Sequence, residues 1–186
     1  MPVEKLMEKR MSIRKYSSRP IDFNKIAEIC NVARLTPCAS NIPTVKIVII
    51  ADKDKIKEIT QATQQPFVGG ARTIILVCSD LKNLKRIHGE EGISIYSRQQ
   101  AGAAIQNMLL KITELGLASC WVGWFDKNAI KRICKIPDNI QIEAVLPLAH
   151  PLNKKAKPKK KIGLKEICFY EKWNQKEKKI EKLSGN

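Results

Sequence analysis

One stretch in the second half of the chain decides the fold, GLASCWVGWF at residues 116–125. A helix is predicted before it, at residues 98–115, because apolar side chains recur every three or four positions between 101 and 112. Gly116 favours the end of that helix. Residues 119–125 then predict a strand with a glycine in its middle. The chain therefore passes from a long amphipathic helix straight into a strand.

The same alternation of helix and strand runs through the rest of the chain. Short apolar, β-branched runs predict strands at residues 45–50, 73–78 and 142–149. Asp22, Asp52 and Asp126 each precede an apolar helical pattern and are expected to cap the helices that follow. Residues 81–96 carry no clear pattern and are expected to form a long loop, whereas residues 167–170 are expected to be extended.

These elements predict an α+β fold in which a central mixed or antiparallel-rich sheet is flanked by helices in three layers. No repeat or long linker divides the sequence, so a single domain is expected over residues 1–186. It would end in a basic loop at 151–163 and a charged tail at 171–186.

Composition limits the kinds of protein that the chain can be. No apolar run approaches the roughly 20 residues of a membrane helix, and residues 1–14 lack the apolar part of a secretory signal, so a cytoplasmic protein is expected. The six cysteines show no C-x-x-C spacing and only two histidines are present, which argues against zinc. We expect reduced cysteines that pack as small apolar side chains.

The net charge is +16, and residues 153–186 alone carry 12 lysines against four glutamates. Clustered lysines attract phosphate, so this excess fits either a solvated surface, a nucleic-acid-binding arm or a preference for anionic ligands. The basic run lacks interleaved aromatic residues and a known nucleic-acid-binding module, which makes nucleic acid the weaker interpretation.

Familiar catalytic motifs are absent from the sequence. We find no G-x-G-x-x-G after a strand, no G-x-x-x-x-G-K-[ST] and no G-x-S-x-G. His88 and His150 stand alone and are interpreted as surface residues. A protein without evident catalytic side chains can take its chemistry from a cofactor.

A candidate anion site lies near the start of the chain. Arg10, Ser12 and Arg14 alternate, so in an extended segment they share one face with neighbours roughly 6–7 Å apart. Two guanidinium groups and a hydroxyl could then meet one phosphate, since the planar fork of arginine suits phosphate oxygens. The alternative interpretation is an exposed basic strand that follows a helix.

Three segments, taken in order, resemble the FMN-dependent nitroreductase family. Residues 9–16, KRMSIRKY, with Pro20 downstream, resemble the family's R-x-S-x-R-x-[FY] opening. Residues 33–41, ARLTPCASN, are similar to its A-x-x-A-P-S-x-x-N stretch, and residues 116–125 are similar to its G-L-x-S-C-W-[IV]-G segment. The resemblance runs from about residue 5 to residue 170.

The resemblance implies a homodimer that binds FMN, takes hydride from NAD(P)H and reduces a small organic electron acceptor by a ping-pong mechanism. It also implies the residues that would bind the cofactor: Arg10, Met11, Ser12, Arg14, Pro37, Cys38, Ala39, Asn41, Trp121, Val122, Gly123, Trp124, Lys159 and Lys161. No side chain is expected to be catalytic; the backbone of Gly123 would face flavin N5. Residues 37–41 would contact the flavin bound mainly by the other subunit.

The sequence departs from the family pattern at three places. Cys38 stands where serine is usual, either as a packed substitute or as a reactive thiol, and residues 43–45, PTV, stand where Q-P-W is usual. Lysines replace the arginine of the family's K-x-R, which leaves point charges without a bidentate fork. A structural role for Gly123 is the alternative to a flavin contact: the glycine could relieve crowding between Trp121 and Trp124, or mark a β-bulge.

Two other functions stay open on sequence alone. One is a nucleic-acid-binding protein with a basic arm, and the other is a flavin-binding protein without turnover.

Overall fold

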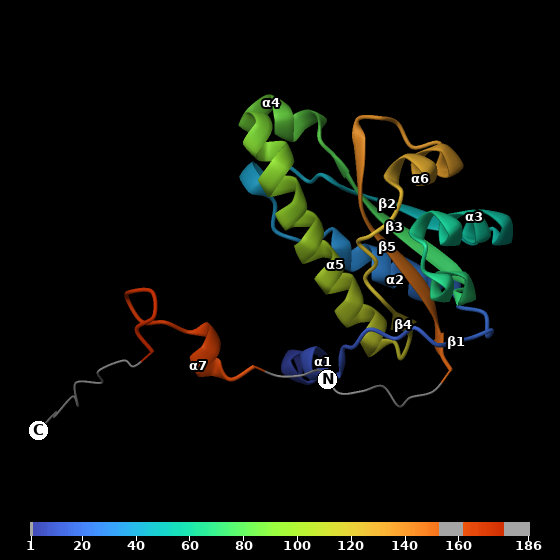
Figure 1. Cartoon of the computed structure of the whole chain (residues 1–186), viewed down its shortest axis with the longest axis horizontal. Helices are drawn as coiled ribbons and strands as arrows, with labels where there is room; N and C mark the ends of the chain where they lie inside the picture. The colour runs from blue at the N-terminus through green and yellow to red at the C-terminus, as the bar shows by residue number, and fades with distance from the viewer. Residues whose placement is uncertain (1, 153–161, 177–186) are drawn as a thin grey trace, which may run out of the picture. The chain divides into compact units, whose positions relative to one another are not determined.

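The computed structural model describes residues 2–152 and 162–176, which fall into two compact units within residues 1–156 and 157–186. The expectation of a single domain over residues 1–186 stays a prediction. The first unit contains these elements (Figure 1): α1 (Val3–Lys9), β1 (Tyr16–Ser17), α2 (Phe23–Ala33), η1 (Ala39–Asn41), β2 (Val45–Ile50), α3 (Lys53–Thr63), η2 (Pro66–Gly70), β3 (Thr73–Asp80), α4 (Lys82–Glu91), η3 (Gly92–Tyr96), α5 (Ser97–Glu114), β4 (Ala118–Ser119), α6 (Lys127–Cys134) and β5 (Ile140–Pro151). The second unit contains α7 (Leu164–Ile167).

The sheet has the strand order β1-β5-β3-β2, and β4 also pairs with β5. Each pairing between the described strands is antiparallel. The long strands β3 and β5 form its centre, and β3 is buried along nearly its whole length. The predicted α+β fold with an antiparallel-rich sheet is confirmed.

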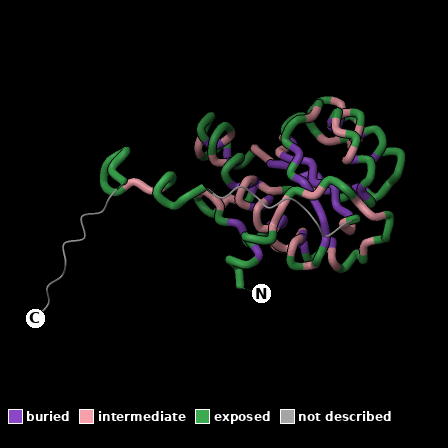
Figure 2. The backbone as a smooth tube through the Cα atoms, turned by 60° about the horizontal axis from the view of Figure 1, so that its bottom comes forward, coloured by how far each residue is buried: buried purple, intermediate pink, exposed green. Residues whose placement is uncertain are grey.

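Helices cover both faces of the sheet and give the predicted three layers (Figure 1). Ile75 and Val77 of β3 face one core with α2 and α5, whereas Ile74 and Leu76 face the other core with α3 and α6. Figure 2 shows the buried segments gathered between exposed helix surfaces. The alternation along β3 is what a strand buried on both faces requires.

A β-bulge adjusts how β5 meets these two cores. The register with β3 shifts between Val77 and Cys78, which pair with Ala144 and Ile142. Glu143 is therefore the extra residue, and Ile142 and Ala144 lie on opposite faces although they are two residues apart.

The predicted helix starts are confirmed by side-chain caps. Asp22 accepts a hydrogen bond from Asn24 N, Asp52 from Lys55 N and Asp126 from Ala129 N, each at 2.9 Å. The end of α5 also follows the sequence, since Gly116 takes a left-handed φ of 68°.

The predicted strand at residues 119–125 is wrong as a continuous element. β4 ends at Ser119, and the next pairing is the single bridge from Val122 to Val145. If this register continues, Cys120 lies opposite Pro147 of β5. The Val145 N–H donates to Val122 on this side of β5, and backbone nitrogens two residues apart in a strand point the same way, so the Pro147 nitrogen also faces Cys120. Proline has no N–H to donate, so the ladder is interrupted there.

Two other expectations are wrong. Residues 81–96 are not a loop but the helix α4 followed by the π-helix η3, with a left-handed Gly89 at the kink between helical turns. That glycine and Gly92 break the apolar periodicity, which hid the helix. In the second unit Ile167 ends the single turn of α7 instead of starting an extended piece.

The apolar face of α5 is used within the chain itself. Ala104, Ile105, Met108, Leu109 and Ile112 pack in the core with α2 and the sheet. This face is therefore not free for a subunit interface. Among the helices of the described part of the chain, none is long and apolar enough to cross a membrane.

Candidate functional site

A backbone hydrogen bond joins two segments that are far apart in the sequence. The Ile13 N–H donates to the Ser119 carbonyl at 2.9 Å. The basic segment 10–14 therefore runs beside the start of the stretch 119–125 that carries Gly123. The structure brings the first and third motifs together within one chain.

The stretch from Ser119 to Asp126 is held along its length. Val122 and Val145 exchange two backbone hydrogen bonds, at 3.1 and 3.0 Å. Beyond Gly123, the Gln65 amide donates to the Trp124 carbonyl at 3.3 Å, and Asp126 N donates to the Ala62 carbonyl at 2.8 Å. The backbone around Gly123 is thus fixed by contacts from β5, from α3 and from Gln65 before η2.

Gly123 itself lies at an open surface. A Cβ built on it would meet no atom within 4 Å, and its φ is not left-handed. Its N–H makes no hydrogen bond within the part of the chain that the structure describes. Trp121 is 43% exposed and Trp124 is 78% exposed. Neither crowding between these tryptophans nor backbone strain accounts for glycine here, so the chain leaves room and a free donor at this point.

The three polar residues of the basic segment have different surroundings. Arg10 is half-buried, Ser12 is exposed, and the Arg14 guanidinium lies over the Phe67 ring at 5.5 Å from its centroid. Arg14 is therefore occupied by a cation–π contact from η2. That both guanidiniums meet one anion stays a prediction. Sequence reasoning missed Phe67, although Pro66 before it and the glycines after it mark an irregular segment.

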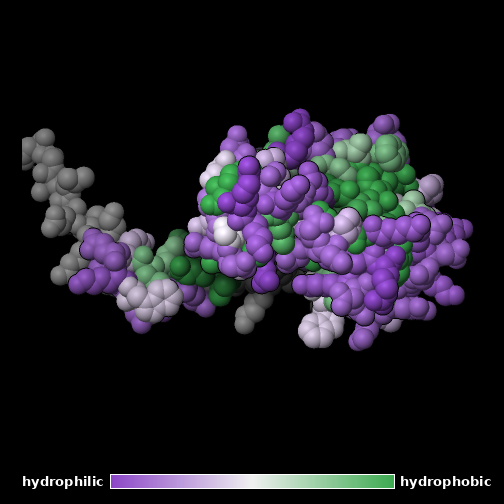
Figure 3. All heavy atoms as spheres, turned by 90° about the horizontal axis from the view of Figure 1, so that it is seen from above, coloured by the Kyte–Doolittle hydropathy of each residue, from purple (hydrophilic) through white to green (hydrophobic). Residues whose placement is uncertain are grey.

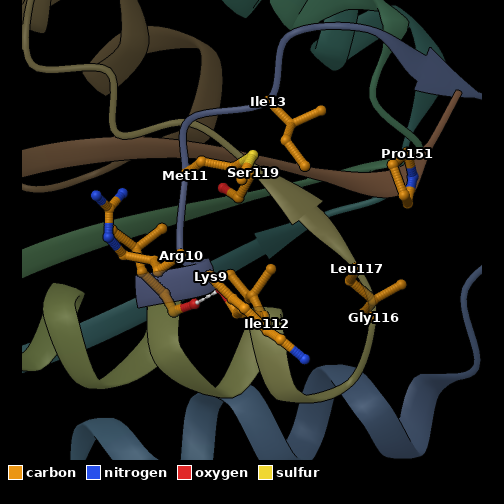
Figure 4. Close-up of a pocket in the computed structure, with 11 residues that line it drawn as sticks. Lys9, Arg10, Met11, Ile13, Ile112, Gly116, Leu117, Ser119 and Pro151 are labelled. Atoms are coloured by element: carbon orange, nitrogen blue, oxygen red, sulfur yellow. Dashed lines mark hydrogen bonds between the residues drawn. The ribbon is translucent and has the colours of Figure 1, made fainter. Parts of the chain in front are cut away.

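A pocket of about 420 Å³ lies behind the basic segment (Figure 4). Met11 and Ile13 line it together with Leu109 and Ile112 of α5, and the side chain of Ser119 lies next to Met11. Its remaining lining residues are Lys9, Arg10, Thr113, Gly116, Leu117 and Pro151. The pocket is thus mainly apolar, with two cations from the end of α1 and the residue after it.

Two buried hydroxyls, one of which lines this pocket, have no hydrogen-bond partner. Ser119 is 3% exposed, and its Oγ makes no hydrogen bond in the structure. The Tyr16 hydroxyl is also buried and unpaired. Burial raises the pKa of Tyr16 well above its ordinary value, and the nearby Cys120 raises it further against the opposing effect of Arg14. Burying a hydroxyl without a hydrogen bond costs free energy. Each of these two hydroxyls is therefore available to donate to, or accept from, a ligand or a water molecule.

The second motif lies on another part of the same long helix. The Asn107 amide donates to Thr36 Oγ1 at 3.4 Å, and Thr44 Oγ1 lies 3.0 Å from the Gln100 side-chain amide. Helix geometry puts Gln100 roughly 18 Å along α5 from Ile112. The turn that holds Pro37, Cys38, Ala39 and Asn41 therefore lies between a contact near the middle of α5 and one near its start, whereas the pocket behind Met11 lies at the end of α5.

Cys38 fits the interpretation of a packed substitute for serine. It is half-buried, and its thiol donates to the Thr36 carbonyl at 3.3 Å. All six cysteines are free. Within residues 2–152 and 162–176, no group of three or more histidines, cysteines, aspartates or glutamates could hold a metal ion. Lys159 and Lys161, like the basic run 154–161 that motivated the nucleic-acid alternative, lie outside the described residues.

Fold and site together define a class: a three-layer α+β protein with a basic segment beside an open, glycine-centred backbone stretch. The model of the nitroreductase family matches residues 7–65 and 58–150. The chain is 30% identical over 156 residues to a protein of Archaeoglobus fulgidus provisionally named NADH dehydrogenase/NAD(P)H nitroreductase. The alignment covers 81% of this chain and 86% of that protein.

Two further comparisons agree with this match. The NADPH-flavin oxidoreductase of Vibrio harveyi is 25% identical over 157 residues, covering 80% of this chain and 65% of that protein. A crystal structure from Parabacteroides distasonis, with the same provisional name as the archaeal relative, superposes with a TM-score of 0.82 at 22% identity, covering 92% of this chain and 98% of the other. The chain belongs to the nitroreductase family, as the three motifs indicated.

Proposed function

We propose that this chain binds FMN and uses it to pass hydride from NAD(P)H to a small organic acceptor, by a ping-pong mechanism. The observation that carries the proposal is the Ile13–Ser119 hydrogen bond, because it sets the basic segment beside the open backbone at Gly123. Family membership and the name of the Vibrio harveyi relative support an oxidoreductase that works with flavin.

The residues present fit such a cofactor. Arg10, Ser12 and Arg14 would hold the phosphate through charge-assisted hydrogen bonds, and Lys159 and Lys161 would add positive charge. The Arg14 guanidinium would either leave the Phe67 ring or contact the ring and the phosphate at the same time. Met11 and Val122 would support the cofactor by packing, and Trp121 and Trp124 would flank its ring.

When bound, FMN supplies two-electron redox chemistry at N5. The chain's own contribution is positional and electrostatic. The free N–H of Gly123 would donate to the ring edge near N5, where a fixed dipole stabilises negative charge without reorganisation. The missing Cβ lets the backbone approach a flat ring closely. The exposed tryptophans would exclude water from that face.

We further propose a homodimer in which the site is completed across the interface. Within one chain, the contacts of this motif run along α5 from Asn107 toward Gln100, away from the end of the helix that lines the pocket behind Met11. Contributed by the other subunit, Pro37, Cys38, Ala39 and Asn41 would close the site. Figure 3 shows hydrophobic side chains gathered in patches on the surface, and Phe23 and Leu35 are among the exposed ones.

The experiment is to purify the protein, denature it and identify the released flavin by chromatography. FMN is expected, since the anion site proposed at Arg10, Ser12 and Arg14, without a dinucleotide fingerprint, suits one phosphate. Anaerobic NADH or NADPH should then bleach the yellow colour, and adding a nitroaromatic or quinone should restore it. FAD, or no flavin after attempted reconstitution with FMN, would contradict the proposal. Bound flavin that neither nucleotide reduces would leave a binding protein without turnover.

A further inference from the structure

The turn at residues 37–41 holds an unusual backbone conformation. Ser40 has φ 49° and ψ 29°, and Asn41 has φ 55°, so two consecutive non-glycine residues are left-handed. Side chains on Cβ disfavour this region, although asparagine tolerates it better than serine does. Contacts from the rest of the chain must therefore hold the turn in place.

Contacts from two helices hold it. The flanks are tied to α5, because Thr36 meets Asn107 and Thr44 meets Gln100. With its amide turned over, Gln100 also accepts from Ala39 N at 3.3 Å. The apex is tied elsewhere: Ser40 Oγ lies 2.9 Å from Nε2 of His88, a residue of α4.

The His88 ring is itself fixed by its surroundings. It meets Tyr96 edge-to-face, with 5.2 Å between ring centroids and 88° between planes. Gly89 takes φ 57° directly after it, which turns the chain out of the helix. A Cβ at Gly92 would lie 2.8 Å from the His88 Cβ and 2.7 Å from the Leu84 carbonyl, so glycine is needed for η3 to pack there. The kinked segment that follows β3 is thus built closely around His88.

We propose that His88 is a positioning residue that acts through Ser40 to fix the turn 37–41, and with it the edge of the flavin site in the neighbouring subunit. The inference rests on the proposed function, which assigns this turn to the flavin. The hydrogen bond forms with either neutral tautomer, since the serine hydroxyl can donate to a bare Nε2 or accept from Nε2–H. His88 does not need to touch the flavin for this role.

The test measures FMN affinity by titrating the apo-protein and following the quenching of flavin fluorescence. His88→Ala and Ser40→Ala should each weaken FMN binding about 2- to 10-fold, the range expected from one lost hydrogen bond. The double variant should be no weaker than the worse single one, because both changes remove the same contact. Ser40→Gly should lose less than Ser40→Ala, since glycine adopts the left-handed conformation without strain. His88→Gln, whose amide can still reach the hydroxyl, should recover part of the loss.

Visible circular dichroism of bound FMN supplies a readout that a merely structural role would not move. It should change in His88→Ala and return toward the parent spectrum in His88→Gln. Matched controls are His150→Ala, the other histidine, and Ser94→Ala, whose hydroxyl donates to the Glu90 carbonyl at the end of α4; both should bind FMN like the parent.

The outcomes separate this inference from the function on which it rests. A parent protein that binds no FMN overturns the proposed function and this inference together. A parent that binds FMN while His88→Ala binds equally well, with an unchanged spectrum, overturns the positioning role alone. Additive losses in the double variant would do the same, because His88 and Ser40 would then act separately.

Discussion

Gly123→Ala should leave the protein as stable as the parent while it damages flavin reduction. A Cβ at this position meets nothing within 4 Å in the chain, and the backbone conformation suits any L-residue. The free energy of unfolding should therefore change by no more than about 0.5 kcal/mol, or rise by about 0.4–1 kcal/mol because alanine restricts the unfolded chain. A ring displaced by about 1 Å from the Gly123 N–H, by contrast, would slow its reduction roughly 100-fold.

Gly92→Ala is the matched control, because the chemical change is the same and the surroundings are opposite. Its Cβ would lie 2.7 Å from the Leu84 carbonyl and 2.8 Å from the His88 Cβ, so the backbone must shift. Overpacking of this kind costs about 1–3 kcal/mol, and each kcal/mol lowers the Tm of a chain this long by about 2–4 °C.

Urea unfolding measures the stability of both variants, and anaerobic stopped-flow reduction by NADH measures the chemistry. Gly123→Ala with parent-like reduction would refute the assignment of the Gly123 backbone to the flavin ring. A loss of more than about 1 kcal/mol in its stability would instead refute the open surface around it.

Three further predictions concern stability, assembly and the phosphate. Burial raises the pKa of Cys78 from 9.0 to about 12, so the thiol of the unfolded chain loses its proton at lower pH than the thiol of the folded chain. The free energy of unfolding should therefore fall as pH rises from 9 to 12, by about 2 kcal/mol at pH 10.5. Urea titrations at several pH values should show this loss, and Cys78→Val should show less of it. Light scattering should give about twice the 21.0 kDa chain mass, and a stable flavin-loaded monomer is incompatible with the proposed site. Arg10→Ala should cost about 1.5–3 kcal/mol of FMN binding, more than the roughly 1 kcal/mol or less expected for Lys159→Ala or Lys161→Ala; titrations in which only the lysine variants lose FMN would move the phosphate site away from Arg10.

Much of the local structure could be predicted because it depends on neighbours in the sequence. The caps at Asp22, Asp52 and Asp126 needed only a side chain beside its own helix. The strands at 45–50 and 73–78 needed only a run of β-branched residues. Where prediction failed, a distant residue or a break in periodicity decided the outcome: Pro147 interrupts the pairing of the stretch after β4, and Gly89 hides the helix α4.

The candidate site also has a part that the sequence predicts and a part that only the tertiary structure shows. The sequence determined which residues could meet an anion or a flat ring, because alternation at Arg10, Ser12 and Arg14 and the bare backbone of Gly123 are local properties. Only the tertiary structure decided that Ile13 pairs with Ser119, that Arg14 lies over Phe67 and that His88 reaches Ser40. These contacts join residues far apart along the chain, and closing such loops depends on how the whole core packs, so no local pattern encodes them.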